Sequence, residues 1–116
     1  MARADERRSA YRLRYPDRAM PAFEAEHAVL RVLDVSERGL RYECPAGEAA
    51  PETGHVITGV LRMHQARTVD VQAVVERVHG RTVSCRLASP GISLNVMFAE
   101  QRWLLRRYPL LFRAAG

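Results

Sequence analysis

One stretch of the sequence decides the fold class: Arg81-Thr82-Val83-Ser84-Cys85-Arg86-Leu87-Ala88. Apolar and polar residues alternate along it, as they do in a β-strand that buries one face and exposes the other. A second apolar run, Thr68 to Val78, ends just before it, and the short segment His79-Gly80 separates the two. Because a tight turn between two such runs joins antiparallel strands, the sequence predicts a β-hairpin here.

Three more strands are predicted earlier in the chain, over His27 to Val35, Leu40 to Glu43 and His55 to Met63. In the first of them, apolar side chains fall on one face and a charged one on the other. A loop rich in proline, glycine and small residues, from Cys44 to Gly54, lies between the second and the third. The chain is therefore expected to consist mainly of short strands.

A single helix is predicted at the C-terminus. After Ser89-Pro90-Gly91 the apolar period changes from two toward about 3.6 residues, and Pro109 ends the pattern. The residues that line one broad apolar face are Leu94, Met97, Phe98, Leu104, Leu105 and Tyr108. Five or six strands followed by one helix predict an all-β fold, a small antiparallel barrel with the helix packed against it.

The size and composition fit one domain without a membrane anchor. A chain of 116 residues can bury one core without metals or crosslinks. It contains no run of eighteen apolar residues, and its first eight residues are charged where a signal peptide turns apolar. We therefore expect a cytoplasmic protein with a flexible arm over residues 1–22, a barrel over 23–92, a helix over 93–110 and a tail over 111–116.

The charge of the chain calls for an anionic partner. Its formal net charge is +5, and all 18 basic residues are arginines. Arginine abundance alone is as consistent with a solvated surface as with a binding patch, so clustering is the better guide. Among the arginines that crowd into the expected arm are Arg7, Arg8, Arg12, Arg14 and Arg18.

Two motifs indicate what the anion is. Arg8 and Arg12 form an Arg-x-x-x-Arg motif in the arm, while Asp34, Ser36 and Gly39 form an Asp-x-Ser-x-x-Gly motif at the end of a predicted strand. A guanidinium can donate parallel hydrogen bonds to guanine O6 and N7 or to a phosphate. A carboxylate accepts hydrogen bonds from the donor edge of guanine. Together the two motifs suit a guanine nucleotide.

This ordered pair of motifs resembles the PilZ domain, a family of cyclic di-GMP receptors, and the resemblance covers nearly the whole chain. It implies a six-stranded antiparallel barrel with a C-terminal helix. It also implies that Arg8, Arg12, Asp34, Ser36 and Gly39 bind the ligand. Asp34 would accept from the N1–H and N2–H₂ edge of guanine, Ser36 would add a hydroxyl, and Gly39 would allow a positive φ or a close approach of the backbone.

The resemblance has further implications for stoichiometry and partners. An arginine at Arg7, directly before the first motif, goes with two stacked ligand molecules per protomer. Arg77, near the end of a predicted strand, is another candidate for the ligand-facing surface. The arm would fold over the nucleotide on binding, and the change would pass to a downstream protein in motility, biofilm formation or virulence.

Two other functions stay open at this point. A small basic barrel can bind nucleic acid along its phosphates, with a steep dependence on salt. A PilZ-like adaptor of pilus assembly or motility would bind protein and no nucleotide, although such members typically lose the arginines. Each motif alone is also common, as a solvated face or as an ordinary turn.

Catalytic and metal chemistry find little support. No G-x-S-x-G elbow surrounds Ser36, and no phosphate-binding P-loop sequence is present. The histidines show no metal-ligand spacing, and these are His27, His55, His64 and His79. We therefore expect no catalytic residue, no metal and no cofactor, only a bound ligand.

Overall fold

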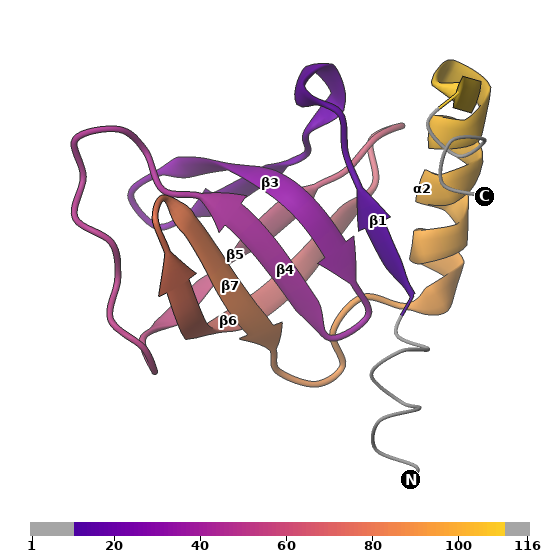
Figure 1. Cartoon of the computed structure of the whole chain (residues 1–116). Helices are drawn as coiled ribbons and strands as arrows, with labels where there is room; N and C mark the ends of the chain where they lie inside the picture. The colour runs from indigo at the N-terminus through magenta and orange to yellow at the C-terminus, as the bar shows by residue number, and fades with distance from the viewer. Residues whose placement is uncertain (1–10, 111–116) are drawn as a thin grey trace, which may run out of the picture.

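Seven strands, all paired antiparallel, and one helix make up the part of the chain that the computed structural model describes, residues 11–110 (Figure 1). The elements are β1 (Arg12–Arg14), a 3-10 turn η1 (Asp17–Ala19), β2 (Ala22–Ala25), β3 (Val29–Ser36), β4 (Gly39–Glu43), β5 (Val56–Arg62), β6 (Thr68–His79), β7 (Thr82–Leu87) and α2 (Leu94–Arg107). Their order in the sheet is β1-β3-β2-β5-β6-β7-β4, and β3 also pairs with β4. This last pairing closes β2 to β7 into a six-stranded barrel, as expected, and leaves β1 as one extra strand.

Side-chain alternation builds the barrel interior. In β7 the predicted alternation is confirmed, because Val83, Cys85 and Leu87 are buried while the residues between them are more exposed. Phe23 of β2 and Val32 of β3 are completely buried in the same core. Burial of an apolar side chain of this size is worth about 1.5–3 kcal/mol, so this interior supplies most of the driving force for closing the sheet.

The strand β1 lies within the segment that was expected to be a flexible arm, residues 1–22. Its residues pair with the end of β3, and Leu13 is only 1% exposed in the core. Tyr15 and Ala19, which follow it, are buried as well. Residues 11–22 are therefore part of the folded domain, because burying these apolar side chains offsets the entropy of ordering the backbone. Residues 1–10 and 111–116 lie outside the described residues.

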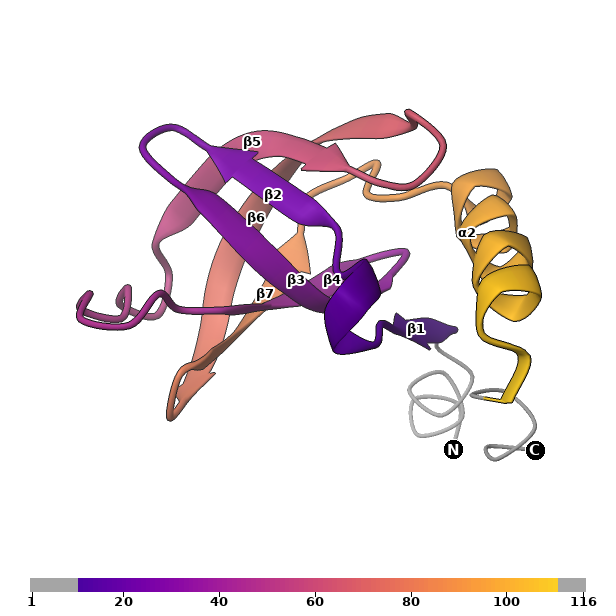
Figure 2. The ribbon, with the colours of Figure 1, turned by 90° about the horizontal axis from the view of Figure 1, so that it is seen from above.

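Helix α2 stands beside the barrel, next to β1 (Figure 2). It begins after Ser93, whose side chain accepts a hydrogen bond from the backbone N–H of Val96 at 3.2 Å. Its buried face carries Met97, Glu100 and Leu104. Among the described residues, no helix is both long enough and apolar enough to cross a bilayer.

A buried polar cluster connects helix α2 to the barrel. Glu100 is 0% exposed, and its carboxylate accepts hydrogen bonds from the Tyr15 hydroxyl at 2.6 Å, the His64 backbone N–H at 2.9 Å and Arg67 Nη2 at 3.0 Å. Burial, followed by the charge of Glu100, raises the pKa of Tyr15 above its ordinary value, so Tyr15 stays a hydroxyl donor. The ring of His64 stacks on that of Trp103 with centroids 3.7 Å apart. This cluster joins α2, the residue after β1 and the β5–β6 connection.

Candidate functional site

A buried carboxylate lies at the centre of the candidate site. Asp34, near the end of β3, is 2% exposed. Arg12 Nη1 donates to Asp34 Oδ1 at 2.7 Å from β1, on one side of β3. Arg41 of β4, directly opposite Asp34 across the β3–β4 ladder, lies on the other side and places Nε at 2.7 Å and Nη2 at 2.6 Å from Oδ2. Two guanidinium groups therefore flank one carboxylate, and this end of the barrel carries excess positive charge.

The other residues of the second motif form the turn beside this carboxylate. Ser36 ends β3 and pairs with Gly39, which begins β4, so the motif is a tight hairpin. A Cβ on Gly39 would lie 3.2 Å from Ser36 Oγ and 3.4 Å from the Cys85 carbonyl oxygen. Close approach therefore explains this glycine, and Gly39 is not among the residues with positive φ. The absent side chain keeps the Ser36 hydroxyl free of crowding.

The last residue of β7 and the segment after it hold this turn in place. The backbone N–H of Ile92 donates to the Glu37 carbonyl at 2.8 Å, and that of Leu87 donates to the Arg38 carbonyl at 2.9 Å. Gly91 has a φ of 73°, and a Cβ there would collide with the Glu37 carbonyl oxygen. The motif turn is thus fixed by backbone contacts from a distant part of the chain.

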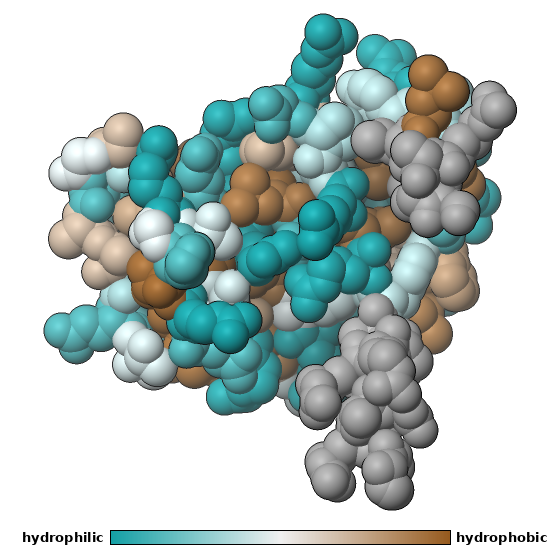
Figure 3. Space-filling model, in the orientation of Figure 1, coloured by the Kyte–Doolittle hydropathy of each residue, from teal (hydrophilic) through white to brown (hydrophobic). Residues whose placement is uncertain are grey.

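A pocket of about 350 Å³ opens over these residues. The predicted residues Arg12, Ser36, Gly39 and Arg77 all line it. Its other charged lining residues are Arg38, Arg41, Glu76 and Arg86. Five arginines face a single glutamate, and that glutamate is 3.3 Å from Arg86 Nε. The balance of charge suits an anion, and Figure 3 shows strongly hydrophilic side chains gathered over this face near β3, β4 and β1.

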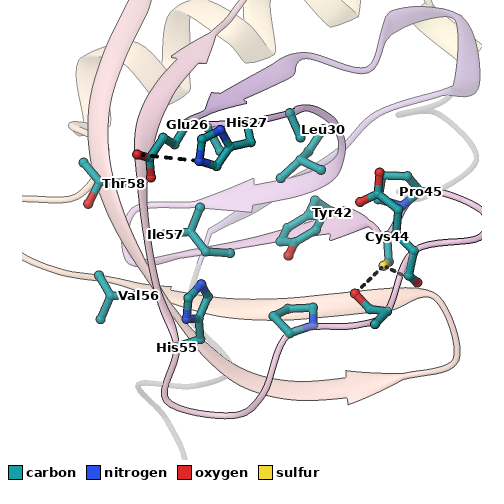
Figure 4. A pocket seen from close by; sticks show the side chains of 15 residues that line it. Glu26, His27, Leu30, Tyr42, Cys44, Pro45, His55, Val56, Ile57 and Thr58 are labelled. Atoms are coloured by element: carbon teal, nitrogen blue, oxygen red, sulfur yellow. Dashed lines mark hydrogen bonds and ion pairs between the residues drawn. The ribbon is translucent and has the colours of Figure 1, made fainter.

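A second hollow, of about 340 Å³, lies beside the start of β3 and the end of β4 (Figure 4). Its walls include Leu30, Tyr42, Cys44 and Ile57, and no arginine lines it. Burial raises the pKa of Tyr42 to about 12, so its phenol is neutral. The five arginines of the first pocket match a phosphate better, and that pocket is therefore the candidate site.

The structure thus brings most of the predicted site together. Arg12, Ser36, Gly39 and Arg77 line one pocket, and Asp34 lies behind it, bonded to the lining residues Arg12 and Arg41. Arg7 and Arg8 lie outside the described residues. In residues 11–110, no group of three or more His, Cys, Asp or Glu side chains is placed to hold a metal ion.

Sequence reasoning missed Arg38, Arg41 and Arg86 of the pocket, and of these three Arg41 is the one that contacts Asp34. A signal for it exists in the spacing, because a two-residue turn at Glu37 and Arg38 pairs Ser36 with Gly39 and hence Asp34 with Arg41. Extending the strand pairing residue by residue from the motif turn would therefore have identified Arg41.

The domain is a closed antiparallel barrel with a flanking helix and an arginine-lined pocket. The family model of the PilZ domain matches residues 6–108, and the chain belongs to the PilZ domain family. No curated protein matches the chain.

Two solved structures have a similar fold. One is the inhibitor of motility MotI/DgrA from Bacillus subtilis, with a TM-score of 0.63 and 16% identity, covering 87% of this chain and 50% of that one. The other is YcgR from Escherichia coli in complex with c-di-GMP, with a TM-score of 0.60 and 19% identity, covering 94% of this chain and 49% of that one. The chain therefore spans about half the length of each. At these identities the likeness concerns the fold.

Proposed function

We propose that this domain is a cytoplasmic, non-enzymatic receptor for cyclic di-GMP that transmits ligand binding to a partner protein. One observation carries the proposal: residues of both motifs, Arg12 from the first and Ser36 and Gly39 from the second, line a single arginine-rich pocket beside Asp34. The solved complex of YcgR with c-di-GMP adds support through the shared fold.

The chemistry of the pocket fits a guanine ring joined to phosphates. Arg12 and its neighbouring arginines can donate to the phosphate oxygens or to guanine O6 and N7, and each bidentate contact to a base is worth about 1–3 kcal/mol of discrimination. Asp34 can accept from the N1–H and N2–H₂ groups of guanine. Adenine presents a different edge, so this carboxylate favours guanine over adenine.

Calorimetry with the full chain tests this function directly. We expect cyclic di-GMP to bind with a Kd in the micromolar range or below, which is about −8 kcal/mol or better. GTP, cyclic di-AMP and single-stranded DNA should bind more weakly. A folded sample that gives no heat with cyclic di-GMP would reject the proposal. Equal affinity for DNA, with a steep dependence on salt, would favour a nucleic-acid-binding barrel instead.

The number of bound ligands is a separate prediction. Arg7 and Arg8 are proposed to add two guanidinium groups to the pocket arginines, more positive charge than one base and its phosphates require. A second stacked ligand would supply further anionic oxygens for them. We expect two cyclic di-GMP molecules per protomer, falling to one in the Arg7→Leu variant, by calorimetry at saturating ligand with a known active fraction. A ratio of one in the wild type would reject this role for Arg7.

A further inference from the structure

The carboxylate of Asp34 has both oxygens engaged. Oδ1 accepts from Arg12 and Oδ2 accepts from Arg41. Because Asp34 is 2% exposed, neither oxygen can turn to solvent for other partners. Oδ1 has a second lone pair, but the burial of Asp34 leaves it little open surface, so a guanine base reaches this carboxylate most directly by taking the place of one arginine.

The two arginines hold Asp34 unequally. Arg41 places two nitrogens within 2.7 Å of Oδ2, and it lies on a strand that pairs with neighbours on both sides, β3 and β7. Arg12 makes a single hydrogen bond from a three-residue strand that pairs with β3. Its side chain is 41% exposed, compared with 34% for Arg41. Arg12 is therefore the partner that can be exchanged.

We propose that Arg41 is a positioning residue that holds Asp34, and that the Arg12–Asp34 ion pair is a latch that the ligand opens. The base donates to Oδ1 in place of Arg12, and Arg12 turns toward the acceptor atoms of the ligand. Both roles rest on the proposed binding of cyclic di-GMP.

Arg41 makes the exchange energetically possible. A buried carboxylate that loses its cationic partner is strongly destabilised. When Arg12 leaves, the two contacts from Arg41 keep the charge of Asp34 compensated. Without Arg41, Arg12 would be the remaining charged partner of this carboxylate, so opening the latch would leave it buried and unpaired.

Variants at position 41 test the proposal by calorimetry with cyclic di-GMP and cyclic di-AMP. We expect Arg41→Met to weaken cyclic di-GMP binding by about tenfold or more and to reduce the preference over cyclic di-AMP. Arg41→Lys keeps the charge but cannot form the two-nitrogen fork, so it should fall between Arg41→Met and the wild type. A purely structural role would lower the melting temperature and leave the preference for guanine unchanged.

Arg31→Met is the matched control. Arg31 forms another ion pair across the same β3–β4 hairpin, with its Nη1 3.5 Å from Glu43 Oε1, and it does not line the pocket. This variant should bind like the wild type.

If the wild type binds cyclic di-GMP and Arg41→Met binds it with equal or tighter affinity, the roles proposed for Arg41 and for the latch are wrong. If Arg41→Met does not fold, Arg41→Lys decides by the same criterion. A wild type that binds no cyclic di-GMP overturns the proposed function itself, and the latch with it.

Discussion

Replacing Arg12 by alanine is expected to weaken cyclic di-GMP binding about thirtyfold or more, or about 2 kcal/mol. The variant loses the charge-assisted contacts that Arg12 makes with the ligand, each worth about 1.5–3 kcal/mol. It also loses the Arg12–Asp34 ion pair, but an arginine as exposed as Arg12 contributes only about 0–1 kcal/mol through such a pair. The melting temperature should barely change, because Arg41 keeps Asp34 compensated.

Arg14→Ala is the control for this experiment. Arg14 is exposed on the same strand, β1, and it is not among the residues that line the pocket. Calorimetry and thermal unfolding should show an Arg14→Ala protein close to the wild type in both affinity and stability. If Arg12→Ala binds as tightly as Arg14→Ala, Arg12 does not contact the ligand and the proposed site is wrong.

Replacing Glu100 by alanine is expected to lower the free energy of unfolding by about 3–5 kcal/mol. The substitution leaves the Tyr15 hydroxyl, the His64 backbone N–H and the Arg67 guanidinium without their shared acceptor in a largely buried place. Since a domain of this size has a total stability of about 5–15 kcal/mol, this loss is a large fraction of the total. Urea unfolding followed by circular dichroism measures the change.

An exposed ion pair gives the comparison for Glu100. Glu24 lies 2.6 Å from Arg62 Nε across the β2–β5 ladder, where both side chains are well exposed. Glu24→Ala should therefore cost no more than about 1 kcal/mol. A Glu100→Ala protein that loses as little as Glu24→Ala would show that the buried cluster contributes little to holding α2.

The strands with clear alternation could be predicted from the sequence, and the short ones could not. The alternation over β7 and the change of period before α2 are local patterns. β7 lies within one residue of its expected bounds, and α2 begins one residue after its expected start and ends three residues before its expected end. In contrast, β1 has three residues and a single buried one, Leu13, and no local pattern is readable over so few positions. Its structure comes from pairing with β3, a contact between residues far apart in sequence.

Polar residues also differ in whether the sequence alone could predict their role. Asp34 could be found because a motif marks it, and Arg41 could be found from the register of the adjoining hairpin. Glu100 could not, because a carboxylate on an amphipathic helix normally faces solvent. Its burial depends on Tyr15 and Arg67, which the fold brings from 85 and 33 positions away.

The stacking of Trp103 on His64 has a practical consequence for spectroscopy. The chain contains one tryptophan, so all of its tryptophan emission arises at the contact between α2 and the β5–β6 connection. The native protein therefore carries an optical probe at the place where the helix meets the barrel. A change in emission wavelength or lifetime would report displacement of the helix without an attached dye, and stopped-flow recording would give its rate.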